Sequence, residues 1–68
     1  MNKISIDTEF IKLDSAMKLA GMVSLGSEAK YAVQDGLVKV NGETELRRGR
    51  KLRSGDKFEY QGKICEIV

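Results

Sequence analysis

The chain has 68 residues, of which 41% are hydrophobic and 32% are charged with both signs mixed, so it can build one small domain. It contains no histidine and one cysteine, which leaves it without the commonest general base, a plausible zinc ligand set or an internal disulfide. No apolar run approaches the roughly 20 residues of a membrane span, and no signal-peptide apolar region opens the chain. We therefore expect a cytoplasmic protein that is not an enzyme, with no cofactor, metal, membrane or small-molecule substrate.

The first third of the chain predicts a strand and a short helix. Ile4–Asp7 alternates apolar and polar residues as a half-buried strand does, and the strand runs on towards Ile11. Apolar residues then recur at helical spacing, at Leu13, Ala16, Met17 and Ala20. We predict a helix over Asp14–Ala20, with Asp14 as a cap or dipole partner and Gly21 as a left-handed stop.

A second helix is predicted between a serine-rich entry and Gly36. Ser24 and Ser27 are two candidate caps for its N-terminus, and Glu28 places a negative charge in its first turn, which suits the helix dipole. Its apolar stripe consists of Ala29, Ala32 and Val33.

The pattern then changes to that of β-strands. Leu37–Val40, the turn Asn41-Gly42 and the returning run Glu43–Leu46 predict a hairpin. Its turn should be of type I′, because Asn-Gly readily accepts the positive φ that both central residues need.

The C-terminal part predicts a second hairpin. A turn at Ser54–Asp56 precedes Lys57–Tyr60, and Lys63–Ile67 returns after Gln61-Gly62. A two-residue loop would place Cys65, read as a small buried residue, opposite Phe58 in the core. The fold class is then α+β, with two short helices packed on a small, mainly antiparallel sheet.

Arg47–Arg53 is the most unusual segment of the chain. It holds five cations in seven positions and no carboxylate, whereas the whole chain carries a net charge of only +2. Like charges repel at this density unless a polyanion neutralises them, so the segment indicates a phosphate-binding loop. The alternative is a solvated loop that only aids solubility. Leu52 is expected to pin the loop to the core.

Four pieces of the chain then form a known series. Lys12-Leu13-Asp14, Gly21, Ser24–Lys30 and Gly36–Gly42 together resemble the RNA-binding domain of small-subunit ribosomal protein four, also called the αL motif. The likeness covers about residues 10–60 and is greatest to the small stand-alone bacterial members. It implies binding of structured RNA, most often ribosomal or transfer RNA, across the two helices and the following loop. We expect residues 1–68 to form a single RNA-binding domain that acts as a monomer. One departure is Gly26, which stands where many members carry an arginine.

The basic run and the resemblance together give the predicted RNA-binding residues, which are Lys12, Lys18, Ser24, Ser27, Lys30, Lys39, Arg47, Arg48, Arg50, Lys51 and Arg53. The serines can serve as helix caps as well as anion contacts, and Lys39 lies on the outward phase of a strand, where it either contacts RNA or faces water. The scattered acids, among them Glu9 and Glu45, show no catalytic pairing and are expected on the face turned away from the RNA.

We interpret the chain as a non-enzymatic RNA-binding module with weak sequence preference, because it has few aromatic residues and no base-reading cluster. Two other classes stay open. A DNA-binding module would use the same basic loop, and a protein-interaction adaptor would use the face of the sheet.

Overall fold

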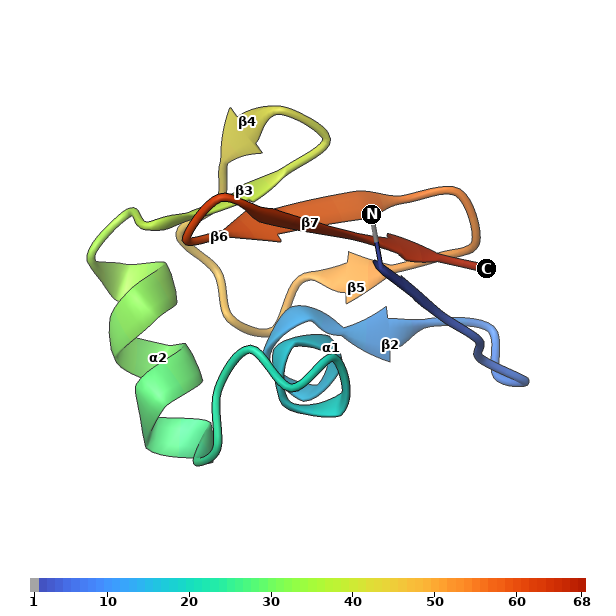
Figure 1. Ribbon diagram of the computed structural model, residues 1–68, viewed down its shortest axis with the longest axis horizontal. Coiled ribbons are helices and arrows are strands. Elements are labelled where there is room, and N and C mark those ends of the chain that lie inside the picture. Colours follow the sequence, from blue (N-terminus) through green and yellow to red (C-terminus); the bar gives the residue numbers. More distant parts are fainter. Residues whose placement is uncertain (1) are drawn as a thin grey trace.

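The computed structural model describes residues 2–68 and places two helices on one face of a five-stranded sheet (Figure 1). In chain order the elements are β1 (Asn2–Ile4), β2 (Ile11–Lys12), α1 (Leu13–Leu19), α2 (Gly26–Gln34), β3 (Val38–Val40), β4 (Glu43–Thr44), β5 (Lys51–Leu52), β6 (Lys57–Tyr60) and β7 (Lys63–Ile67). The strand order of the large sheet is β1-β7-β6-β3-β4, and β2 pairs with β5 in a separate two-stranded sheet. Every pair is antiparallel except β1 with β7, which confirms the predicted α+β fold.

Both predicted hairpins form, and their turns have the expected backbone. Asn41 and Gly42 have φ of 52° and 86°, and Gln61 and Gly62 have φ of 54° and 77°. Positive φ at both central residues is the signature of a type I′ turn, whose twist matches that of the flanking strands. The second turn fixes the register so that Phe58 lies opposite Cys65, as predicted.

The N-terminal segment differs from the prediction. The sequence indicated one strand from Ile4 towards Ile11, but β1 and β2 belong to different sheets. Asn2–Ile4 runs parallel to the last strand, with Ile4 next to Ile67, and the chain then crosses to pair Ile11 with Leu52. Alternation along the chain cannot reveal this division, because each partner strand lies in the C-terminal part of the sequence.

The other elements are close to their predicted bounds. The helix α1 begins and ends one residue before the predicted range, and β4 is shorter than the predicted returning strand. Gly21 and Gly36 follow the two helices with φ of 75° and 74°, so both act as the expected left-handed stops. Neither helix within residues 2–68 is long and apolar enough to cross a membrane.

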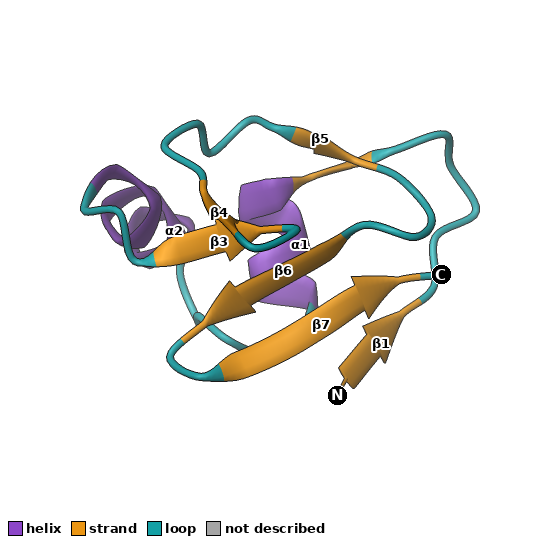
Figure 2. Ribbon diagram, turned by 90° about the horizontal axis from the view of Figure 1, so that it is seen from above, coloured by secondary structure: helices purple, strands orange, loops and turns teal. Residues whose placement is uncertain are grey.

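The core lies between the helices and the inner face of the large sheet. Buried helical residues are Leu13, Ala16, Met17, Ala29, Ala32 and Val33, and buried strand residues are Val38, Val40, Leu52, Phe58, Cys65 and Ile67. The alanines carry small side chains, which lets the two helices pack closely against each other. The β2–β5 pair lies apart from the large sheet, beside α1 (Figure 2). Leu52 of β5 is buried in the core, as predicted.

Candidate functional site

The basic loop between β4 and β5 is fixed against the start of α1 by backbone hydrogen bonds. The Leu13 N–H donates to the Arg50 carbonyl at 2.8 Å, and the Asp14 N–H donates to the Arg48 carbonyl at 3.0 Å. These two N–H groups belong to the first turn of the helix, which has no side-chain cap. The loop therefore serves as the cap of α1, and the helix in turn holds the loop in a defined shape.

The β2–β5 pair brings two predicted site residues together. Lys12 lies directly opposite Lys51, while their neighbours Ile11 and Leu52 face the core. Both lysines are exposed, and neither forms an ion pair with any of residues 2–68. Lys51 Nζ lies 4.8 Å from the centroid of the Phe10 ring, so a cation–π contact holds it. Like charges directly opposite destabilise a strand pair, so this position is suited to an anion.

Glu45 contacts the basic loop through its carboxylate, and the sequence did not predict this contact. Its carboxylate accepts hydrogen bonds from Arg47 Nε at 3.0 Å and from Arg50 Nη1 at 2.9 Å. These two arginines, with Arg47 contributing most, lower the pKa of Glu45 from 4.5 to about 2. The expectation that the acids lie away from the predicted RNA-binding residues is thus wrong for Glu45. It also fails for Glu9, which lies 3.4 Å from the Arg53 guanidinium.

The end of the loop is anchored to the first hairpin through Asp56. The Arg53 N–H donates to Asp56 Oδ2 at 2.8 Å, and Asn41 Nδ2 donates to Asp56 Oδ1 at 3.1 Å. The bond from Arg53 is the main reason that the pKa of Asp56 is lowered. Asn41 also accepts the N–H of Lys57 at 3.0 Å, so one turn residue joins β3, β6 and the loop.

The remaining cations of the run stay on the surface. Arg48 and Lys51 are exposed, and an open hollow beside them is lined by Arg47, Gly49, Arg50 and Lys51. The loop therefore presents several of its cations around an open hollow on the surface rather than inside an enclosed cavity.

The entry of α2 is built differently from the prediction. The helix begins at Gly26 with Leu25 as its N-cap residue, and no side chain caps it. Ser24 lies before the N-cap, and Ser27 already lies within the first turn, so neither serine is the cap. Both serines are exposed. Glu28 lies in the first turn, as expected for the helix dipole.

The other predicted lysines do not gather at the loop. Lys18 lies in the last turn of α1, at the end of the helix away from the loop. Lys30 projects from α2, with its Nζ 5.9 Å from the Tyr31 ring centroid. Lys39 lies between the buried Val38 and Val40 and so points to the outer face of the sheet, opposite Glu59 in β6. Of these three, Lys39 lies on the face away from the helices.

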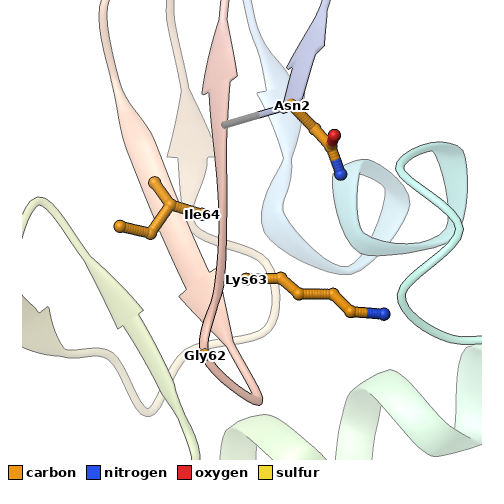
Figure 3. Close-up of a pocket in the computed structure, with 4 residues that line it drawn as sticks. All are labelled: Asn2, Gly62, Lys63 and Ile64. Atoms are coloured by element: carbon orange, nitrogen blue, oxygen red, sulfur yellow. The ribbon is translucent and has the colours of Figure 1, made fainter.

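A further hollow lies at the edge of the sheet and offers little chemistry. Its lining residues are Asn2, Gly62, Lys63 and Ile64, and Figure 3 shows Asn2 and Lys63 pointing to one side of the sheet and Ile64 to the other. Lys63 is the one charged residue in that lining. Within residues 2–68 no group of three or more His, Cys, Asp or Glu side chains could hold a metal ion.

Comparison with known proteins places this arrangement in a family. The family model described as S4 domain matches residues 4–68. The chain belongs to the S4 domain family. This confirms the resemblance to the ribosomal-protein-four domain that the sequence motifs indicated.

Two curated relatives match most of this S4 domain. A Bacillus subtilis (strain 168) protein named probable ribosome maturation protein RlbA is 48% identical over 61 residues, which cover 90% of this chain and 86% of that protein. An Escherichia coli (strain K12) protein named putative RNA-binding protein YbcJ is 33% identical over 58 residues, which cover 85% of this chain and 83% of that protein.

The fold agrees with a solved structure as well. The solution structure of YbcJ from E. coli superimposes with a TM-score of 0.77 at 30% identity, covering 100% of this chain and 87% of that one. That structure is described as revealing an αL motif involved in RNA binding. The predicted αL fold is therefore confirmed.

Proposed function

We propose that this S4 domain binds structured RNA through phosphate contacts on a surface formed by the start of α1 and the β4–β5 loop. The observation that carries the proposal is the placement of Lys12 directly opposite Lys51, beside a loop that is capped onto α1 by Leu13 and Asp14. Two lysines at facing positions, neither in an ion pair within residues 2–68, would both be stabilised by an RNA phosphate bound between them.

The RNA partner is proposed to be ribosomal RNA on a ribosomal particle. The name of the B. subtilis relative, a probable ribosome maturation protein, supports this choice over transfer RNA. Residues 1–68 would act as one domain, as a cytoplasmic monomer and without catalysis, since binding alone accounts for the arrangement of the loop.

Recognition by shape and charge is the proposed mode of binding. Tyr31 is the one aromatic side chain within residues 2–68 that is largely exposed, whereas Phe58 is buried in the core. We therefore do not expect RNA bases to stack on a row of aromatic side chains. The fixed loop would instead follow the backbone of a folded RNA, which gives weak sequence preference.

The test compares an RNA stem-loop with a DNA duplex of equal length, by fluorescence anisotropy over a range of salt concentrations. We expect tighter binding of the RNA and a log–log salt slope of roughly −3, because about four phosphate contacts release counterions. Equal binding of the DNA would favour the DNA-binding alternative. Absence of RNA binding at low salt would overturn the proposal and favour a protein-interaction adaptor.

Three charge-reversal variants test which surface binds RNA, namely Lys12→Glu, Arg48→Glu and Lys51→Glu. These residues are exposed, so the fold should persist while RNA affinity falls strongly. Lys63→Glu, at the far edge of the sheet, is the matched control for the change in charge. An equal loss of affinity in the control would mean that the contact surface is not the one proposed.

A further inference from the structure

Glu45, the residue that follows β4, holds two arginines of the basic loop with one carboxylate. Its carboxylate lies at the end of the first hairpin with 8% of the side chain exposed, and it accepts three bonds from Arg47. These come from the backbone N–H at 3.1 Å, Nε at 3.0 Å and Nη2 at 3.3 Å. Arg50 Nη1 donates to the same carboxylate at 2.9 Å.

The Arg47 guanidinium is fixed and yet exposed. Its side chain is 75% exposed, although Nε and Nη2 are both engaged by Glu45. An arginine has five N–H donors in a planar fork, so the edge formed by Nη1 and the second hydrogen of Nη2 still points to no acceptor among residues 2–68. Arg50 differs, because its side chain is only 34% exposed and it lies deeper against the carboxylate.

We propose that Glu45 is a positioning residue that holds Arg47 as a preformed fork for an RNA phosphate. The inference rests on the proposed function and adds to it which group of the loop is set in place before RNA arrives. A free arginine loses rotamer freedom when it binds a phosphate, whereas Arg47 has already lost that freedom to a buried carboxylate. The carboxylate lies on the buried side of the guanidinium, so the exposed edge faces solvent and the approaching anion.

Neutralising Glu45 separates two effects on RNA affinity, that of the net charge of the protein and that of the position of the Arg47 guanidinium. Glu45→Gln raises the net charge of the protein by one, and if charge alone mattered, RNA would bind more tightly. A glutamine amide can accept from one arginine but presents an NH2 group to the other, so it cannot hold both. If position matters, the variant binds RNA more weakly despite its higher positive charge, by about tenfold.

The matched control is Glu43→Gln, measured with the same RNA stem-loop. Glu43 lies two residues earlier in β4, is exposed and forms no ion pair within residues 2–68, so the substitution adds the same charge without touching Arg47. We expect Glu43→Gln to tighten RNA binding slightly and Glu45→Gln to weaken it. Equal tightening in both variants would overturn the proposal while leaving RNA binding itself intact.

A second variant keeps the test decisive if Glu45→Gln does not fold. Arg47→Lys preserves the charge of an exposed residue, so the fold should persist, but an ammonium cannot bind Glu45 and present a planar fork together. We expect about a fivefold loss of RNA affinity with an unchanged salt slope. Unchanged affinity of Arg47→Lys would overturn the positioning role, and failure of the wild-type protein to bind the stem-loop would overturn the proposed function itself.

Discussion

Lys12 and Lys51 are direct partners in the antiparallel pair of β2 and β5, so two exposed lysines occupy facing positions on one side of the ribbon. Their neighbours Ile11 and Leu52 fix this register, because Leu52 is fully buried and Ile11 packs against the core. A slip by one residue would expose Leu52, so the lysines cannot move apart without loss of core packing. The core contacts of Ile11 and Leu52 therefore keep two like-charged residues at facing positions of the strand pair.

Lys12→Gln should separate stability from binding. Removing one charge relieves the repulsion with Lys51, so the free energy of unfolding should stay level or rise by about 0.2–0.5 kcal/mol. RNA affinity should fall, because a phosphate contact is lost. Urea denaturation and fluorescence anisotropy measure the two effects. Lys57→Gln is the control, since Lys57 faces Glu66 on β7. It should lose a little stability and retain most affinity, and equal losses of affinity in both variants would contradict the assignment.

Gly26→Arg should tighten RNA binding. Gly26 is the first residue of α2, does not have a positive φ, and a Cβ there would meet no atom within 4 Å. The backbone therefore accepts the arginine that many family members carry. One added phosphate contact should strengthen binding by about 1 kcal/mol, or roughly fivefold, and steepen the salt slope by about 0.7 to 0.9.

Gly26→Ala is the control that isolates helix propensity from charge. It should raise stability by up to about 1 kcal/mol without a change in salt slope. If Gly26→Arg weakens RNA binding at unchanged stability, the glycine backbone itself approaches the RNA, and the contact belongs to N–H groups rather than to a side chain.

Local chemistry was sufficient to predict much of this fold. Asn41-Gly42 and Gln61-Gly62 determine turn geometry within two residues, so the hairpins and the pairing of Phe58 with Cys65 followed from the sequence. The predicted N-terminal strand was wrong because the partners of β1 and β2 lie in the C-terminal part of the chain. The periodicity of a strand indicates that it is a strand, but it does not show which distant segment is its partner.

The sequence predicted only part of the candidate site, again because some of its contacts join segments that are distant along the chain. The basic run is contiguous, so its charge is visible in the sequence, whereas its contact with Lys12 depends on the β2–β5 pair. Glu45 was missed because it lies in a mostly polar returning run, Glu43–Leu46, and only the fold of the loop brings Arg50 back onto that carboxylate. The serine caps were wrong because the helix begins between Ser24 and Ser27.

The Glu45 carboxylate should make stability depend on acid pH. Its pKa is about 2 in the folded protein against an ordinary 4.5, so the folded state favours the ionised form. The contribution to stability is fully present above about pH 4.5 and is lost as the pH falls towards 2. Asp56, whose pKa is also lowered, acts in the same direction.

Urea denaturation of the wild-type protein and of Glu45→Gln, repeated at several pH values, measures the contribution of the Glu45 carboxylate to the free energy of unfolding. At neutral pH the variant should be less stable by about 1–2 kcal/mol, because the arginines lose a charged acceptor. The difference between the two proteins should narrow as the pH falls from 4.5 towards 2. A difference that stays constant over this range would mean that Glu45 is not held ionised by Arg47 and Arg50.

The two type I′ turns should differ in their effect on RNA binding. Gly42 and Gly62 both have positive φ, and a Cβ at either would meet no atom within 4 Å, so Gly42→Val and Gly62→Val strain the backbone alone. Each should cost about 1–3 kcal/mol of stability, because a β-branched residue rarely adopts this conformation. Thermal unfolding of the two variants should therefore show similar losses.

The Gly42→Val and Gly62→Val variants should differ in their affinity for RNA. Asn41, next to Gly42, is bonded to Asp56, which holds the Arg53 N–H, so strain in this turn reaches the basic loop. Gly62 lies at the opposite end of β6, where no hydrogen bond leads to the loop among residues 2–68. Affinity per folded molecule should fall for Gly42→Val and stay close to wild type for Gly62→Val. An equal fall in both would extend the RNA-binding surface over the C-terminal hairpin.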